Sequence, residues 1–277
     1  MVLNWIEAIL YGFLSGLAEF MPVSAQAHQQ ILIRLFGCDE SSSLMNLFVH
    51  MGALFAILLS SGGYLNKLSK EYSLSKSHRR RRKREVDMQA VFDVNFVKTA
   101  CIPLLIGFVL YAKTMGWGNN LPLISVFLIL NGIILFIPSY LATGNKDSRN
   151  MSALDAILFG LASALSALPG VSRVAGGHTL AVARGADPHE AFKWSLLLSI
   201  PALAVLMCFD LYTIFAIGSG ATGSFFLLKC LIGFAFSYIG ATISIAFMKS
   251  LTLRSGLSVF SYYSWGAALF TFIIYLF

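Results

Sequence analysis

Two segments of the sequence combine ionisable side chains with helix-breaking residues inside otherwise apolar stretches. The first carries Glu19 and His28 on either side of Pro22, and the second carries Arg173 and His178. A guanidinium is always charged, and its planar fork of donors suits phosphate oxygens. A carboxylate can hold a cation or position water, and an imidazole can act as nucleophile, acid or metal ligand. Together these residue types predict a buried site for an anionic phosphate group.

Small residues next to Arg173 favour a close approach between the backbone and an anion. Gly176 and Gly177 follow Arg173 in the sequence, and the N-terminus of a following helix would also favour negative charge. We therefore expect Arg173 and these glycines to form a phosphate-binding turn. Ser24 and Ser172 could also bind the phosphate, or they could only cap the helices that follow them.

Each of these ionisable residues also has a structural explanation. A charged side chain at the centre of a membrane helix costs at least about 2.5 kcal/mol, so Glu19 must be paired, protonated or metal-bound. An ion pair between Glu19 and Arg173 could serve only to lock the two segments together. His28 and His178 could be hydrogen-bonded structural residues, although their matched positions favour a functional role. For His50, which lies in an unbroken apolar stretch, we favour a structural role.

The composition places these residues in a membrane protein. Of the 277 residues, 57% are hydrophobic and 12% are charged, and the mean hydropathy is +0.75. An average soluble domain has roughly 25% charged residues. We therefore exclude a soluble globular enzyme, a disordered protein and a nucleic-acid-binding domain. The net charge of +7 does not change this conclusion, because nine Lys and Arg residues lie in one segment between Lys67 and Arg84.

Six stretches are apolar and long enough to cross a bilayer core about 30 Å thick. They lie at roughly 44–64, 94–115, 121–143, 191–217, 224–248 and 255–277. Two more stretches, about 2–36 and 153–183, are broken by Pro, Gly and ionisable residues, which membranes tolerate only inside protein or beside a wet cavity. We predict a single membrane domain over 1–277, all-α and polytopic, with six transmembrane helices and two re-entrant helix–loop–helix hairpins.

The two broken segments share an order of residues that indicates an inverted-topology repeat. Each contains Pro, then Val-Ser, then His, and then an Arg six residues after the His, namely Arg34 and Arg184. Three predicted spans follow each segment, and because three is odd the second half must be inverted relative to the first. We predict repeats over about 1–145 and 150–277, with the ligand site between them. Chance similarity between two Pro- and Gly-broken helices is the alternative explanation.

The distribution of basic residues orients the chain. Segment 65–93 contains the cluster from His78 to Arg84, so the positive-inside rule predicts a cytoplasmic loop. Both termini then lie on the external side, together with loops 37–43, 116–120 and 218–223, which contain no Lys or Arg. Contact with anionic lipid headgroups explains the basic run without a partner protein. The four cysteines form no CxxC pair, and we expect neither a disulfide framework nor a zinc site.

The motifs around these residues resemble those of the undecaprenyl-diphosphate phosphatase family of the bacitracin-resistance type, over nearly the full chain. The first reads Gly-Leu-Ala-Glu-Phe-Met-Pro-Val-Ser over 16–24, with His28 after it, and a later one reads Leu-Pro-Gly-Val-Ser-Arg over 168–173. The stretches 47–52 and 190–202 extend the resemblance. It implies a hydrolase that removes one phosphate from undecaprenyl (polyprenyl) diphosphate and so recycles the carrier lipid for peptidoglycan synthesis.

The resemblance also implies a setting and roles for individual residues. The protein would be a multi-pass protein of the bacterial cytoplasmic membrane, with its site facing the external side. Its candidate partners would be polyprenyl diphosphate, the lipid bilayer and a second copy of itself in a homodimer. Arg173 would clamp the diphosphate, His28 would be nucleophile or acid/base, and Glu19 would position water or hold a divalent cation, Mg²⁺ or Ca²⁺. The substrate-binding residues would be Ser24, Ser172, Arg173, Gly176, Gly177 and His178.

The sequence departs from the family pattern at several of these motif positions. Ser15 stands where the family has its first Glu, Ala25 where it has a second Ser, and Ala27 where it has Gly. After Arg173, the residues Val-Ala-Gly-Gly replace Ser-Gly-Ala-Thr. A single carboxylate weakens the binding of hard cations, which prefer several oxygen ligands. His178 could supply a lost function.

Two functions therefore stay open at the level of sequence. The first is the polyprenyl-diphosphate phosphatase, and the second is a catalytically impaired relative that binds or translocates polyprenyl phosphate, a role that suits an inverted repeat. A phosphatase of the phosphatidic-acid type is excluded, because the spacing from Arg173 to His178 is one residue short and its partner motifs are absent.

Overall fold

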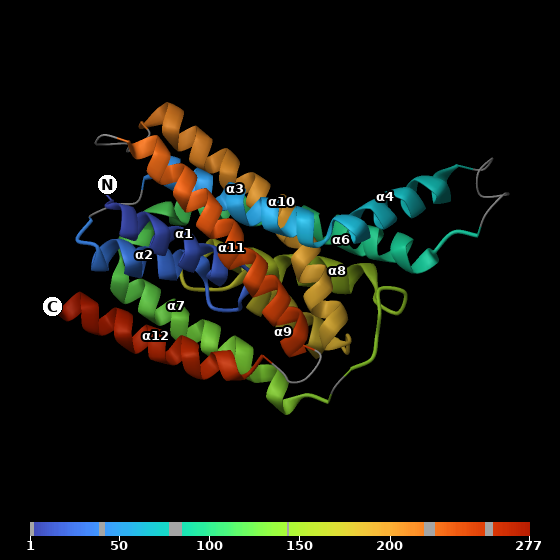
Figure 1. The fold of residues 1–277 in the computed structure, drawn as a ribbon. Helices are drawn as coiled ribbons and strands as arrows, with labels where there is room; N and C mark the ends of the chain where they lie inside the picture. The colour runs from blue at the N-terminus through green and yellow to red at the C-terminus, as the bar shows by residue number, and fades with distance from the viewer. Residues whose placement is uncertain (1–2, 39–41, 78–84, 143, 219–224, 253–256) are drawn as a thin grey trace.

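The computed structural model describes the 277-residue chain except for residues 1–2, 39–41, 78–84, 143, 219–224 and 253–256 (Figure 1). The described residues form helices and connecting turns, and the β-structure among them is an isolated bridge between Lys146 and Ala186. The all-α class predicted from the sequence is confirmed. The predicted basic cluster from His78 to Arg84 lies outside the described residues.

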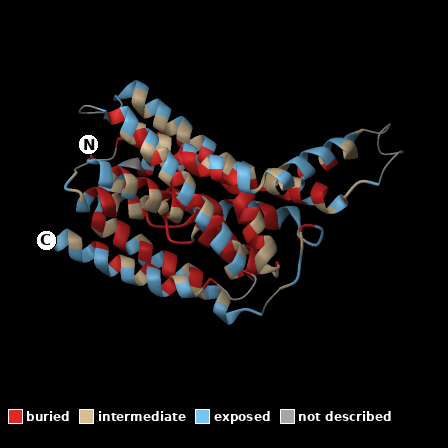
Figure 2. Cartoon of the chain, viewed as in Figure 1, coloured by how far each residue is buried: buried red, intermediate tan, exposed pale blue. Residues whose placement is uncertain are grey.

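Within the described residues, six helices are long and apolar enough to cross a membrane, as the sequence predicts. They are α3 (Ser43–Ser60), α6 (Met88–Thr114), α7 (Leu121–Phe136, extended by the 3-10 turn Ile137–Tyr140), α10 (Pro188–Ala216), α11 (Phe226–Thr252) and α12 (Val259–Leu276). Large apolar side chains cover the outside of this bundle, and Figure 2 shows buried residues gathered on the inward faces of the helices. An apolar exterior of this kind is what a lipid environment requires.

Each of the two broken segments forms a helix, a break and a second helix. The first consists of α1 (Trp5–Phe20) and α2 (Ala25–Leu35), and the second of α8 (Ala153–Ala164), a 3-10 turn (Leu165–Ala167) and α9 (Arg173–Ala183). Capping boxes, Asn4 with Glu7 and Ser152 with Asp155, begin α1 and α8. The re-entry of these hairpins into the membrane and the inverted repeat stay predictions.

Segment 65–93, which the sequence analysis treats as a loop, is largely helical where it is described. Helix α4 (Gly62–Lys76) follows α3, and the first turns of α6 run beside it, so that the pair projects from one end of the bundle (Figure 1). Leu68 of α4 packs on Ala90 of α6 and Leu197 of α10, and all three are buried. The sequence misses α4 because its many Lys and Ser residues hide a narrow apolar stripe.

Close helix packing holds the hairpins against the long helices. Helix α1 packs along α11, and α8 packs along α6. Small residues permit this approach: a Cβ added at Gly16 would lie 2.1 Å from the Ser237 carbonyl oxygen, and one at Gly160 would lie 2.2 Å from that of Ala100. The first hairpin thus docks on a helix of the second half, and the second hairpin docks on a helix of the first half. As a result, the two breaks meet near the middle of the molecule.

Candidate functional site

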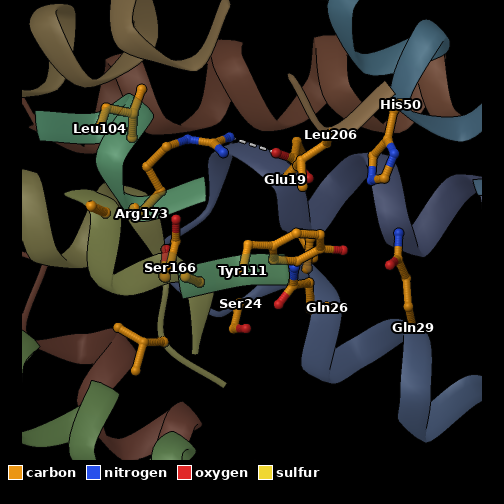
Figure 3. A pocket seen from close by; sticks show the side chains of 17 residues that line it. Glu19, Ser24, Gln26, Gln29, His50, Leu104, Tyr111, Ser166, Arg173 and Leu206 are labelled. Carbon is orange, nitrogen blue, oxygen red and sulfur yellow. Dashed lines mark hydrogen bonds and ion pairs between the residues drawn. The ribbon is translucent and has the colours of Figure 1, made fainter. Parts of the chain in front are cut away.

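The two breaks bring the buried charges of the sequence together. Arg173, the first residue of α9, donates from Nη2 to Glu19 Oε1 in the last turn of α1 at 2.6 Å, and the two side chains are only 8% and 7% exposed (Figure 3). Arg173 also donates from Nε to Ser199 Oγ of α10 at 3.3 Å. The ion pair considered from the sequence therefore exists, and what surrounds it decides whether it only locks the hairpins.

Hydrogen bonds between the breaks hold them in contact. The Gly170 N–H donates to Ser24 Oγ at 3.2 Å, and Ser172 Oγ donates to the Met21 carbonyl at 3.4 Å. Ser24 has φ 64°, a left-handed conformation that costs a residue with a side chain about 1 kcal/mol or more. Ser172 caps α9, with its Oγ accepting from the Ala175 N–H at 3.4 Å. The predicted capping role is therefore confirmed for Ser172, whereas the Ser24 side chain does not cap α2 and instead binds the other break.

Asn131 of α7 ties the two breaks together from the side. Its Nδ2 donates to the Pro22 carbonyl at 2.9 Å and to Ser264 Oγ of α12 at 3.0 Å, while its Oδ1 accepts from the Ser172 N–H at 2.8 Å. The side chain is fully buried. Asn131 is not among the residues predicted from the sequence, although an amide in the middle of a strongly apolar helix is a visible signal.

A cavity opens beside the Glu19–Arg173 pair, between the breaks and the long helices. Its wall contains Glu19, Ser24, Ser172 and Arg173 among the predicted site residues. The other polar side chains of the wall are Gln26, Gln29, His50, Tyr111 and Ser166, and apolar residues such as Leu104 and Leu206 complete it (Figure 3). A partly polar pocket with a charged pair in its wall has the usual composition of a small-molecule site.

The structure does not bring His28 into this wall. Its Nδ1 donates to the Ser24 carbonyl at 2.9 Å, and its Nε2 accepts from the Tyr263 hydroxyl of α12 at 2.7 Å. The two rings also stack, with centroids 5.7 Å apart. His28 instead lines an apolar hollow between α1, α2 and α12. Both of its nitrogens are engaged there, which is the structural reading of this histidine.

The glycines after Arg173 and His178 also lie outside the wall of the cavity. A Cβ at Gly176 would lie 2.3 Å from the Ala162 carbonyl oxygen, and one at Gly177 would lie 2.5 Å from Ser163 Oγ, so both glycines serve the contact of α9 with α8. His178 is 2% exposed on the same helix, and its ring nitrogens have no hydrogen-bond partner among the described residues. The two glycines thus serve helix packing, and none of these three residues lies in the cavity wall with Arg173.

His50 is the histidine that the structure places in the cavity wall. It lies on α3, and its Nδ1 donates to Asp210 Oδ2 of α10 at 2.6 Å. Both side chains are mostly buried, at 8% and 12% exposure. The sequence analysis passes over Asp210 and favours a structural role for His50. The available signal was a His and an Asp, each alone in an apolar run, with no spacing to connect them.

The family comparison agrees with this architecture along the whole chain. Residues 8–270 match the family model described as bacitracin resistance protein BacA. The chain belongs to this family. An undecaprenyl-diphosphatase of Methanobrevibacter smithii is 30% identical over 97% of this chain and 96% of its own. Enzymes of the same name from Thermodesulfovibrio yellowstonii and Alkaliphilus metalliredigens are 30% and 28% identical, over 98% and 94% of this chain and 97% and 94% of theirs.

The departures from the BacA-family motifs have clear places in the structure. Ser15 is buried on α1 and its hydroxyl has no hydrogen-bond partner among the described residues, whereas Ala25 lies in the cavity wall. A serine at position 25 would add a hydroxyl to the cavity wall, and a glutamate at position 15 would add a carboxylate one helical turn before Glu19. This member of the family therefore holds its polar site with one carboxylate, Glu19, and without a hydroxyl at position 25.

The donor set decides which cation this site fits. Among the described residues, no group of three or more His, Cys, Asp or Glu side chains could enclose a metal ion. An all-protein cage of the kind that Ca²⁺ prefers is therefore a poor fit. Mg²⁺ is commonly held by one or two carboxylates together with water and substrate phosphates. Glu19 in the cavity wall is the carboxylate that could take part in a site of that kind.

Proposed function

We propose that the protein hydrolyses undecaprenyl diphosphate or a similar polyprenyl diphosphate to the monophosphate, and so recycles the carrier lipid of the cell envelope. The observation that carries this proposal is the Glu19–Arg173 pair beside a cavity between the two breaks. The names of the relatives support it, because they are undecaprenyl-diphosphatases of nearly the same length.

Arg173 is the group that recognises the phosphate in this proposal. In the absence of substrate, the Glu19 carboxylate balances its charge and so offsets the desolvation cost of a buried cation in an apolar protein. A diphosphate carries more negative charge than one carboxylate and presents oxygens to both arms of the guanidinium. Arg173 then exchanges its bond with Glu19 for bonds with phosphate oxygens, and the same bonds stabilise the charge that develops during phosphoryl transfer.

The exchange releases Glu19 for a second task. Its carboxylate would hold Mg²⁺ or, less well, Ca²⁺ together with the substrate's own phosphate oxygens, and the cation would offset the charge of the diphosphate. Ser24 and Ser172 keep the two breaks in register around the phosphate. His28, Gly176, Gly177 and His178 support this arrangement through packing rather than through contact with the phosphate.

The open end of the site supports a location on the external side of the bacterial cytoplasmic membrane. A second, polar cavity continues from the first toward the start of α3, with Ser43 and Asn46, and toward the end of α10, with Thr213 and Ile217. Helix α4, which carries Lys67, Lys70 and Lys76 and precedes the basic cluster in the sequence, lies at the opposite end of the bundle (Figure 1). If the positive-inside rule places the basic segment in the cytoplasm, this opening faces outward. A homodimer stays a prediction of the sequence.

Phosphate release from undecaprenyl diphosphate by the purified protein in detergent tests the proposal, with Mg²⁺, Ca²⁺ or a chelator. We expect release with Mg²⁺, and we expect Glu19→Gln to lower it by about 10²-fold, since one charged group at the reacting phosphate is lost. Glu85→Gln, at an exposed position, is the matched control. Binding of the lipid without any release would instead favour the binder or translocator.

A further inference from the structure

We propose that His50, held by Asp210, is the general base that activates water for attack on the terminal phosphorus. This inference rests on the proposed function and names a catalytic residue that neither the family resemblance nor the motifs assign. It begins with the hydrogen bond from His50 Nδ1 to Asp210 Oδ2 at 2.6 Å. Because the carboxylate accepts, the proton lies on Nδ1, and Nε2 keeps a lone pair that can take a proton.

The position of His50 between two cavities supports this role. The inner cavity contains Glu19 and Arg173, and the outer, more polar cavity contains Asp210. His50 lines both of them, together with Gln26, Gln29, Tyr111 and Ala167. Figure 3 shows the imidazole on the side of the site that carries Gln29, across Glu19 from Arg173. His50 therefore borders both the cavity of the Glu19–Arg173 pair and the polar cavity that would supply water.

The other histidines near the breaks cannot take this role in the described arrangement. His28 uses both nitrogens, toward Ser24 and Tyr263, and lies in the apolar hollow. His178 is 2% exposed and lies in the wall of neither cavity. The groups that share the surroundings of His50 are Asp210, which holds it, and Glu19, Arg173 and Tyr111 across the cavity. His50 is thus the histidine that shares a cavity wall with Glu19 and Arg173 and is held from Nδ1 by Asp210.

The chemical step balances with water as the other reactant. The water oxygen forms a bond to the terminal phosphorus while one of its protons moves to His50 Nε2. The bond from that phosphorus to the bridging oxygen breaks, and its electron pair stays on the polyprenyl monophosphate. The terminal phosphate leaves as inorganic phosphate with the second water proton. His50 is left as an imidazolium beside Asp210 and returns its proton to the water of the outer cavity.

A purely structural role is the competing explanation, because the same hydrogen bond also ties α3 to α10. The variant His50→Asn separates the two, since an asparagine amide can still donate toward Asp210 from about the place of Nδ1 but has nothing at the place of Nε2. We expect His50→Asn to fold and to bind undecaprenyl diphosphate as the wild type does, and to lower kcat by about 10³-fold. His50→Ala should show the same loss, and added imidazole should restore part of its activity.

Asp210 acts through His50 and is a positioning residue. Asp210→Asn should lower kcat with little change in KM, because the substrate does not contact this side chain, and Asp210→Glu should recover part of the loss. His189→Ala, in the first turn of α10 and outside both cavity walls, is the matched control and should keep full activity.

These assays separate the role of His50 from the proposed phosphatase function. Full activity in His50→Asn, or a loss in His50→Ala that imidazole does not repair although lipid binding is intact, overturns the role of His50 while the phosphatase proposal stands. If the wild type binds the lipid and releases no phosphate under any metal condition, the proposed function fails, and this inference fails with it.

Discussion

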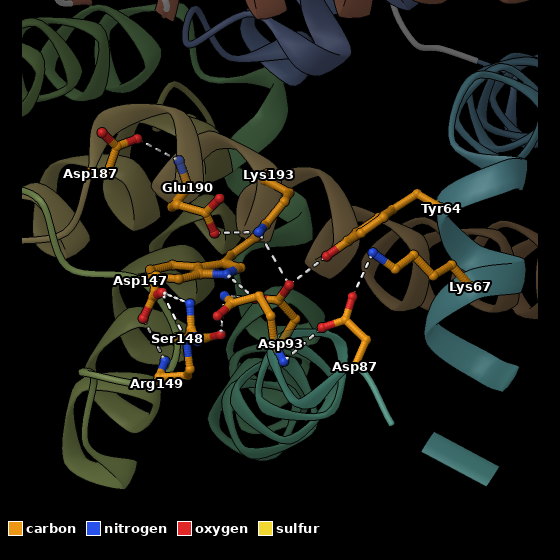
Figure 4. A network of polar contacts seen from close by, with 12 residues as sticks. Tyr64, Lys67, Asp87, Asp93, Asp147, Ser148, Arg149, Asp187, Glu190 and Lys193 are labelled. Carbon is orange, nitrogen blue, oxygen red and sulfur yellow. Dashed lines mark hydrogen bonds and ion pairs between the residues drawn. The ribbon is translucent and has the colours of Figure 1, made fainter. Parts of the chain in front are cut away.

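Two clusters of buried charge, one at the start of α10 and one farther along it, show how differently the same residue types are used. At the start of the helix, Asp93 is 1% exposed and accepts hydrogen bonds from Tyr64, from Lys193 Nζ at 3.1 Å and from Trp194 Nε1 at 3.0 Å (Figure 4). Near the middle of the molecule, Glu19 accepts from Arg173 beside an open cavity. The Asp93 carboxylate is surrounded by hydrogen-bond donors, whereas the Glu19 carboxylate borders a cavity.

The difference indicates which cluster is structural. Lys193 is also paired with Glu190, and burial together with the hydrogen bond to Asp93 raises the pKa of the Tyr64 hydroxyl and keeps it a donor. This network joins α4, α6 and α10, and both oxygens of its central carboxylate, Asp93, accept hydrogen bonds from protein groups. The Glu19–Arg173 pair instead borders a cavity, so an incoming anion can replace one partner. Functional sites commonly keep charged groups of this kind, whose partner in the bound state is the ligand.

The largest effect is expected at the cavity, for Arg173→Lys. Lysine keeps the charge but lacks the planar fork that grips two phosphate oxygens, so we expect phosphate release to fall by about 10³-fold. Arg149→Lys is the control, because Arg149 is 55% exposed and pairs with Asp147 at the surface. Rates of phosphate release at saturating substrate measure the difference, and equal rates in the two variants would show that Arg173 only locks the hairpins.

At the enclosed cluster we expect a large effect on stability and none on chemistry. Asp93→Asn leaves Lys193 with Glu190 as its partner. It also replaces one carboxylate oxygen, an acceptor, with an amide NH₂ that faces the donor of Tyr64 or Trp194, and this mismatch should lower the free energy of unfolding by about 1–3 kcal/mol. The apparent melting temperature in detergent should fall, while the rate per folded molecule stays at the wild-type value. A kinetic defect in the folded fraction would mean that this network communicates with the site.

A smaller, mixed effect is expected where the two breaks are tied together. Asn131→Ala removes three hydrogen bonds and leaves the Ser172 N–H and the Pro22 carbonyl without this partner, at about 1–3 kcal/mol. Looser breaks position Arg173 less well, so kcat should fall by about 10-fold. Asn66→Ala on the exposed face of α4 provides the comparison in the same assays. Unchanged kcat would show that α9 holds Arg173 without help from α7.

The smallest effect is expected for the surface pair of Lys67 and Asp87. Their 2.6 Å contact is 52% and 36% exposed, and such pairs add little to stability. The hydrogen bond from Lys67 lowers the pKa of the Asp87 carboxyl, so any stabilisation is present above its ordinary pKa and is lost as the pH falls. Because the pair is exposed, its contribution at pH 7 is small, and Asp87→Asn and the wild type should have nearly the same melting temperature in detergent. A clear difference between the two melting temperatures would contradict this.

The sequence alone predicts the helical class, the six spans and the Glu19–Arg173 pair at the centre of the site. It does not predict the contacts that single residues make with distant parts of the chain. Long apolar runs reveal the six spans because lipid leaves few other compositions for a helix that crosses it. The cost of isolated charge leads directly to the pairing of Glu19 with Arg173. No periodicity, however, indicates that His50 meets Asp210 or that His28 turns toward Tyr263, since each partner lies more than a hundred positions away.

Residue type alone also misleads where two physical uses compete. Gly176 and Gly177 suit a phosphate-binding turn equally well as a tight helix contact, and the structure uses them for the contact of α9 with α8. The lysines of α4 suggest a loop, and only the buried face of Leu68 reveals a packed helix. In both cases the decision depends on what lies opposite in space, which a sequence does not state.

The central claim is that the cavity between the breaks is the diphosphate site and that Arg173 exchanges Glu19 for phosphate. A structure of the protein with a polyprenyl methylene-diphosphonate, which cannot be hydrolysed, tests it most directly. The account predicts the phosphonate oxygens at hydrogen-bond distance from the Arg173 guanidinium, about 2.7–2.9 Å, with Glu19 released from that contact. A diphosphonate bound elsewhere, with the Glu19–Arg173 pair intact, would contradict it.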